Sequence, residues 1–183
     1  EVHDVRVDVG LPTDEVEERV DVGDLVTMDQ RTQPLGDCIS GKSIDNRVSV
    51  FALLELARRI EDPTATIHFV ATVQEEVGLR GAQTIGVDLD PDLALALDTT
   101  VANDLSDFDE YDHVTDLGAG TAIKLKDSSV ITNRKVHRRL REVAEQEGIE
   151  HQFEVLPTGG TDTGGLQRAH GSVPVGAVSI PTR

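Results

Sequence analysis

Residues 93–98 read LALALD, an alternation of leucine and alanine that ends on the carboxylate of Asp98. Two further runs are similar in character. Residues 65–73 are rich in β-branched and apolar side chains, and residues 173–180 form another apolar stretch. Runs of this length and composition predict β-strands. The fold is therefore expected to contain at least these three strands.

Helical patterns lie between the predicted strands. Apolar residues recur at i, i+3, i+4 and i+7 from Val50 to Ala57, which predicts an amphipathic helix that runs to about Ile60. Residues 133–148 predict a second helix, whose arginines are interpreted as a solvated face. Strands that alternate with helices indicate a layered α/β fold.

The first 37 residues have a different pattern. Valines at positions 5, 7 and 9 alternate with polar residues, which predicts a half-buried strand, and residues 24–28 resemble another strand. Thr13 offers an N-cap for a short helix that ends near Val20. We therefore divide the chain into a small β-rich unit, residues 1–37, and an α/β domain, residues 38–183.

The charge balance excludes one class of partner. The 183 residues include 34 Asp and Glu against 17 Lys and Arg, which gives a formal net charge of -17. Such a chain is not expected to bind nucleic acid. Its dense carboxylates and few lysines are typical of proteins from salt-loving archaea, although a merely acidic cytosolic protein would show a similar balance.

Cysteine content and hydropathy bear on the compartment. Cys38 is the only cysteine, so no intrachain disulfide can form, and any metal must be bound by carboxylates and histidines. No run of about 18 apolar residues occurs, and the chain does not open on a basic stretch followed by an apolar one. These features predict a soluble, cytoplasmic protein with no membrane partner.

Carboxylates stand where predicted strands end or helices begin. Asp45 precedes the first long helix, Glu75 and Glu76 follow residues 65–73, and Asp98 ends the next strand. In open α/β sheets, ligands bind beyond the carboxyl ends of the strands. Carboxylates that converge there either raise one another's pKa or bind a cation such as zinc, cobalt or manganese. The alternative is that each is only an acidic helix N-terminus.

Longer motifs carry a family resemblance. Five segments occur in one order: SIDNR at 43–47, VATVQEEVGLRGA at 70–82, LD at 97–98, PTGGTDTGG at 157–165 and SIPTR at 179–183. Together they resemble the glutamyl-aminopeptidase and tetrahedral-aminopeptidase family of dinuclear metallopeptidases. The resemblance implies a layered αβα catalytic domain with a mixed sheet, preceded by part of an oligomerisation domain. It also implies a peptide substrate and a homo-oligomer.

The resemblance also implies roles for individual residues. Asp45 would bridge two divalent metal ions, zinc or cobalt, and the bond after it would be cis. Glu76 would bind one ion and Asp98 the other, while Glu75 would act as general base. The substrate-binding loop would comprise Gly159, Gly160, Thr161 and Asp162. These roles are consistent with hydrolysis by a water acidified between two metals.

The match to the family ends at two histidine ligands, which would lie outside both ends of this chain. We therefore expect weak metal binding and impaired activity of the chain alone. Two alternatives stay open. An endoglucanase-like glycosidase, a label that relatives carry, needs facing carboxyls and an aromatic cleft, whereas aromatic residues are only 3% of this chain and tryptophan is absent. A catalytically dead assembly module is the non-enzymatic alternative.

Overall fold

The computed structural model describes residues 5–106 and 109–183. The chain divides into two compact units, residues 1–42 and residues 43–183. Among the described residues, no helix is long and apolar enough to span a bilayer.

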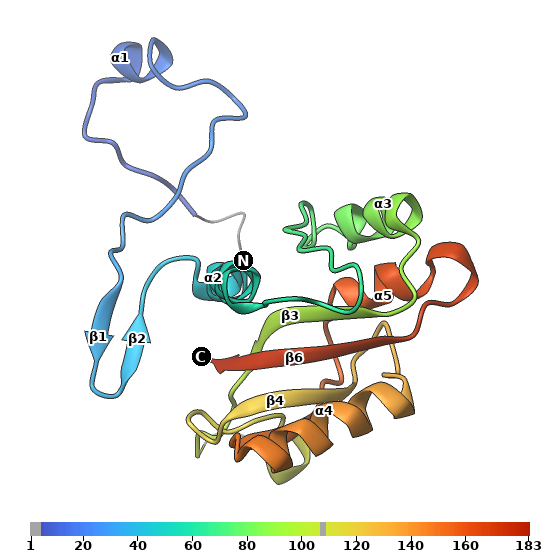
Figure 1. The fold of residues 1–183 in the computed structure, drawn as a ribbon. Helices are drawn as coiled ribbons and strands as arrows, with labels where there is room; N and C mark the ends of the chain where they lie inside the picture. The colour runs from blue at the N-terminus through green and yellow to red at the C-terminus, as the bar shows by residue number, and fades with distance from the viewer. Residues whose placement is uncertain (1–4, 107–108) are drawn as a thin grey trace. The chain divides into compact units, whose positions relative to one another are not determined.

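The first unit contains little regular structure. Helix α1 covers Thr13–Glu17, with Pro12 at its N-cap position, and strands β1 (Gln33–Leu35) and β2 (Cys38–Ser40) form an antiparallel hairpin (Figure 1). The strands predicted for residues 5–9 and 24–28 are wrong, because neither segment is a strand in the structure. No residue from 5 to 42 is buried in this structure, so the alternating valines have no core face against which to pack.

The second unit is built on a mixed four-stranded sheet in the order β3-β6-β4-β5. Strand β3 (Ala94–Val101) runs parallel to β6 (Val175–Thr182), and β4 (Thr121–Lys126) runs parallel to β5 (His151–Val155). Strands β4 and β6 are antiparallel. This arrangement confirms the predicted α/β class with a mixed sheet, and it confirms the strands predicted at residues 93–97 and 173–180.

Helices cover both faces of the sheet (Figure 1). They are α2 (Ile44–Arg59), α3 (Arg80–Leu89), α4 (Arg134–Glu147) and α5 (Asp162–Gln167), with 3₁₀ turns η2 (Glu110–Asp112) and η3 (Ala169–Gly171). The two helices predicted after residues 50 and 133 are confirmed by α2 and α4. Helix α4 begins after Asn133, whose side chain accepts a bond of 2.9 Å from the Lys135 N–H.

The side chains of β3 alternate between the face of the sheet that carries α4 and the face that carries α5. Leu95 lines an apolar groove of about 270 Å³ with Val136 and Leu140 of α4. Ala94, one residue earlier, packs on the other face against the same buried cluster as Leu166 of α5. Because successive side chains of a strand point to opposite faces, Asp98 lies on the side of α5 and not on that of α4.

In the second unit, one predicted strand is absent, and two of the observed strands were not predicted. Residues 65–73 pair with no strand of the described sheet, and Ile67 and Phe69 stay 44% and 40% exposed. A β-branched run becomes a strand only where a neighbour supplies a ladder of hydrogen bonds. Strands β4 and β5 escaped prediction because their fully buried positions include two charged residues, Lys124 and Glu154.

Candidate active site

Five carboxylates from four segments of the chain converge in the second unit. They come from the first turn of α2, the loop after residue 73, strand β3 and the first turn of α5: Asp45, Glu75, Glu76, Asp98 and Asp162. Their proximity is evident in the electrostatics, because the charges of the other four all raise the pKa of Glu75. The structure thus brings together the four acidic residues singled out in the sequence. It adds Asp162, which belongs to the glycine-rich loop, residues 157–165.

The start of α2 is joined directly to β3. The peptide bond between Asp45 and Asn46 is cis, as the resemblance implied. The Asn46 side-chain Nδ2 donates to the Leu97 carbonyl oxygen at 3.2 Å and to Asp98 Oδ1 at 2.9 Å. The Thr99 N–H donates to the same Asp98 oxygen at 2.8 Å. Two donors therefore fix the Asp98 carboxylate, and one of them comes from the residue next to Asp45.

A tightly closed loop presents Glu75 and Glu76. The Gly81 N–H donates to the Val73 carbonyl at 3.0 Å, and the Leu79 N–H donates to the Glu75 carbonyl at 2.9 Å. A Cβ atom on Gly81 would lie only 2.8 Å from the Val73 nitrogen, so this closure requires glycine. In the loop, the Glu75 side chain is partly buried whereas Glu76 is exposed. The two adjacent glutamates therefore occupy different environments.

Burial and neighbouring charges raise the pKa of Glu75 and Asp98. Burial, followed by the charges of Asp98 and the other carboxylates, raises the pKa of Glu75 from its ordinary 4.5 to about 7. Burial also raises the pKa of Asp98 from 3.8 to about 6, opposed by the Thr99 hydrogen bond and the Lys124 charge. Near neutral pH, Glu75 therefore exists in both protonated and ionised forms, as a group that transfers protons requires.

Asp162 links the glycine-rich loop to the Glu75 loop. The Thr72 hydroxyl donates to Asp162 Oδ2, and Thr72 lies three residues before Glu75. Asp162 Oδ1 is buried and has no hydrogen-bond partner in the part of the chain that the structure describes. Burial raises the pKa of Asp162, and the bond from Thr72 opposes this shift. An unpartnered anionic oxygen next to other carboxylates is a position where a cation would be stabilised.

The rest of the predicted substrate loop leads into α5. Gly159 and Gly160 precede the buried Thr161, and Asp162 is the first residue of the helix. Gly159 has φ of 91°, a backbone conformation that favours glycine. The loop therefore uses glycine for its backbone conformation at residue 159 and contributes one side chain, Asp162, to the carboxylate cluster.

The chemistry of these residues fits divalent cations, although the coordination they offer is incomplete. Carboxylate oxygens are good donors for divalent ions, and bound cations would relieve the repulsion that raises the pKa of Glu75 and Asp98. Within residues 5–106 and 109–183, however, no three His, Cys, Asp or Glu side chains are grouped to hold one ion.

Comparison with known proteins places the chain. The family described as M42 glutamyl aminopeptidase matches residues 1–183. The chain belongs to this family. A putative aminopeptidase from Acetivibrio thermocellus is 36% identical over 178 residues, which cover 97% of this chain and 53% of that protein. The chain spans about half the length of the curated relatives it matches.

Solved peptidase structures share the fold. An aminopeptidase from the archaeon Desulfurococcus kamchatkensis matches with a TM-score of 0.88 at 36% identity, over 93% of this chain and 49% of its own. The TET1 peptidase of Pyrococcus horikoshii, which can assemble into a tetrahedron or a large octahedral shell, matches with a TM-score of 0.72 at 30% identity, over 92% of this chain and 49% of its own.

Sequence reasoning missed three residues that bear on the site. Asn46 and Thr72 lie inside the quoted motifs, next to Asp45 and shortly before Glu75, so their position was the available signal. Lys124 lowers the pKa of Asp98 from a different strand. Nothing in the sequence near Asp98 points to this lysine, because only the sheet brings the two together.

Proposed function

We propose that this chain carries the catalytic carboxylates of a metal-dependent aminopeptidase, which releases N-terminal amino acids from peptides. The observation that carries the proposal is the convergence of four carboxylates on Glu75, whose pKa is raised to about 7 by burial and by their charges. Membership of the M42 glutamyl aminopeptidase family supports the reaction class. Since the matched relatives are about twice as long, the activity of the whole protein is part of the proposal.

Glu75 is assigned the proton transfer. A carboxyl with a pKa near neutral accepts a proton readily from an attacking water and returns it readily to a departing amine. No hydrogen bond holds the Glu75 side chain among the residues that the structure describes, so its carboxylate is free to exchange protons. Asp162, fixed by Thr72, supplies further negative charge beside it.

Asp45, Glu76 and Asp98 are assigned to metal binding, with Asp45 shared between two ions. Divalent cations, when bound, acidify water and stabilise negative charge on a carbonyl oxygen. Asn46 holds the Asp98 carboxylate in place for this role through the bond from its Nδ2. Zinc or cobalt is the proposed metal, because both accept oxygen donors alongside histidine.

The same proposal includes a homo-oligomer in which residues 1–37 belong to the assembling domain. The likeness to TET1, a peptidase that assembles into closed shells, supports it. A cytoplasmic, salt-adapted protein is also proposed, on the basis of the net charge of -17 and the single cysteine.

The first test compares an unblocked peptide with its N-acetylated twin, in high salt with added cobalt or zinc. The wild-type chain should release amino acids only from the free N-terminus. The Glu75→Gln variant should lose activity by about 10²-fold to 10⁴-fold, the usual contribution of a general base. Equal cleavage of the acetylated peptide would refute the aminopeptidase assignment, and glucan hydrolysis that survives a chelator would favour the glycosidase alternative.

A further inference from the structure

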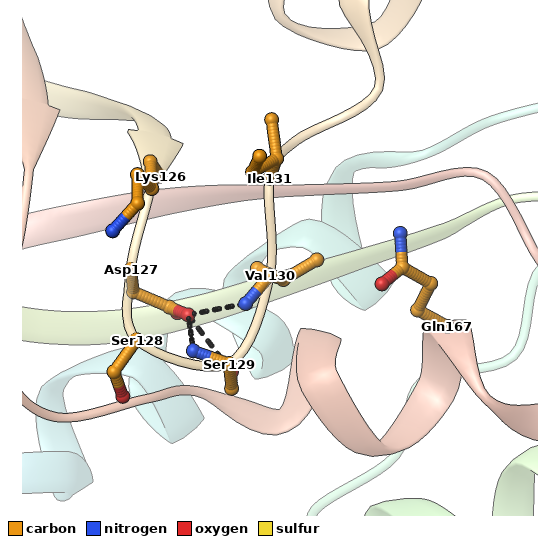
Figure 2. A pocket seen from close by; sticks show the side chains of 7 residues that line it. All are labelled: Lys126, Asp127, Ser128, Ser129, Val130, Ile131 and Gln167. Carbon is orange, nitrogen blue, oxygen red and sulfur yellow. Dashed lines mark hydrogen bonds between the residues drawn. The ribbon is translucent and has the colours of Figure 1, made fainter.

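Asp127, a buried carboxylate outside the acidic cluster, is hydrogen-bonded to the glycine-rich loop. Asp127 follows the last residue of β4 and is 2% exposed. Its Oδ1 accepts bonds from the Ser129 N–H at 2.7 Å, the Ser129 hydroxyl at 2.8 Å and the Val130 N–H at 2.8 Å. Figure 2 shows these bonds beside a surface cavity of about 410 Å³, lined also by Gln167. One carboxylate oxygen thus organises the whole turn.

The other Asp127 oxygen faces the loop. Oδ2 accepts a bond of 3.3 Å from the hydroxyl of Thr161, and Thr161 and Thr163 hydroxyls are 2.6 Å apart. A threonine hydroxyl has a single proton, so Thr161, which donates to Asp127, must accept from Thr163. All three side chains are almost completely buried. A directed chain of hydrogen bonds therefore runs from α5 to Asp127.

The turn after Asp127 makes further contacts with the glycines. The Ser128 N–H donates to the Gly159 carbonyl at 3.0 Å, and the Ser128 hydroxyl donates to the same oxygen. A Cβ atom on Gly164 would lie 2.7 Å from the Ser129 Cβ and would clash with its hydroxyl. Backbone of the loop and side chains of the turn are therefore packed too closely for any residue but glycine at position 164.

We propose that Asp127 is a positioning residue of the active site, which holds the loop from Gly159 to Asp162 in place for the reaction. The inference rests on the proposed aminopeptidase function, because it concerns the same site. Asp127 itself touches none of the reacting groups. It fixes Thr161, and the next residue, Asp162, then meets Thr72 and the Glu75 cluster. Small displacements of such a loop reduce turnover strongly, since the reacting groups must stay aligned.

The Asp127→Asn variant separates positioning from folding. An asparagine keeps one acceptor oxygen for the Ser129 and Val130 bonds, but it places an amide donor where the Thr161 hydroxyl donates. We expect amide hydrogen exchange of residues 159–163 to become at least about 10-fold faster. We also expect kcat for the unblocked peptide to fall about 10-fold to 100-fold, with KM changed by no more than about twofold. Thr161→Val should produce the same increase in exchange.

Asn133→Ala is the matched control. Asn133 accepts a backbone bond at the start of α4, as Asp127 does in its turn, but among the described residues its side chain forms no hydrogen bond with the loop. This variant should lower the melting temperature and leave both loop exchange and kcat unchanged. Unchanged exchange in Asp127→Asn would overturn the proposal, and so would faster exchange with an unchanged kcat. If wild-type protein releases no amino acid, the aminopeptidase proposal fails, and the exchange comparison alone still decides whether Asp127 holds the loop.

Discussion

Carboxylates on the two sides of the glycine-rich loop have opposite environments. On one side, Glu75 and its neighbours crowd together, and burial with mutual repulsion raises the pKa of Glu75 to about 7. On the other side, Asp127 accepts four hydrogen bonds. Within the sheet, Glu154 Oε1 is paired with the ammonium group of Lys124, whereas Glu154 Oε2 has no hydrogen-bond partner among the described residues. The fold is thus able to satisfy a buried carboxylate such as Asp127, yet it leaves the Glu75 side chain and Asp162 Oδ1 without a hydrogen-bond partner among the described residues. Such a contrast is typical of a functional site on a scaffold stabilised elsewhere.

The largest effect should follow from breaking the buried ion pair. Lys124 and Glu154 are fully buried cross-strand neighbours, and Thr100 also donates to Glu154 at 2.7 Å. Lys124→Met leaves a buried carboxylate unpaired, so the free energy of unfolding should fall by about 3–5 kcal/mol. Urea unfolding measures this. The double variant Lys124→Met, Glu154→Leu should recover most of the loss, because an apolar pair needs no partner. A single variant as stable as wild type would show that the pair contributes nothing.

This pair also explains how far the fold could be predicted from sequence. Strand β3, helix α2 and helix α4 were predicted because their apolar residues follow the period of the element. Strands β4 and β5 were not, since the buried positions of β4 include Lys124 and those of β5 include Glu154. Charge at a buried position hides a strand until its partner across the sheet is known. The valines at 5, 7 and 9 gave the opposite error, an alternation with no core to face.

The candidate site was predictable to a similar extent. Asp45, Glu75, Glu76 and Asp98 were identified by motif, and the structure brings them together. The groups that hold them were not identified. Thr72 and Asp162 are 90 residues apart, and Thr161 and Asp127 are 34 apart. Contacts of this kind are set by how the elements pack, which no local pattern encodes.

A second prediction concerns pH. A carboxyl whose pKa is higher in the folded state binds its proton more tightly there, so its contribution to stability is fully present below the unfolded pKa. For Glu75 that contribution should be lost as pH rises from about 4.5 through about 7. Glu75→Gln removes the dependence, so the variant should gain stability relative to wild type between pH 5 and pH 8. Screening by solvent limits the gain to about 1 kcal/mol.

Urea midpoints at the two pH values, with a chelator and constant salt, measure this gain. Asp104→Asn is a useful control, because Arg183 lowers the pKa of Asp104 below its ordinary 3.8, so this carboxyl is ionised throughout and its removal should leave the difference between pH 5 and pH 8 unchanged. Parallel curves for wild type and Glu75→Gln would mean that the crowding of the carboxylates does not affect folding.

The smallest effect on stability is expected at Asn46, where activity and stability should diverge. Asn46→Ala removes the 2.9 Å bond to Asp98 and the 3.2 Å bond to the Leu97 carbonyl, losses that together cost about 1–2 kcal/mol. It also removes the Asn46 Oδ1 atom, which is buried without a partner among the described residues. Removing an unsatisfied buried oxygen stabilises the folded state and offsets part of this cost. The free energy of unfolding should therefore fall by less than about 1 kcal/mol. In contrast, kcat/KM should fall about 10-fold, because only the Thr99 N–H still orients Asp98. Equal losses of stability and activity would mean that Asn46 serves the fold alone, and that the acidic cluster is organised without it.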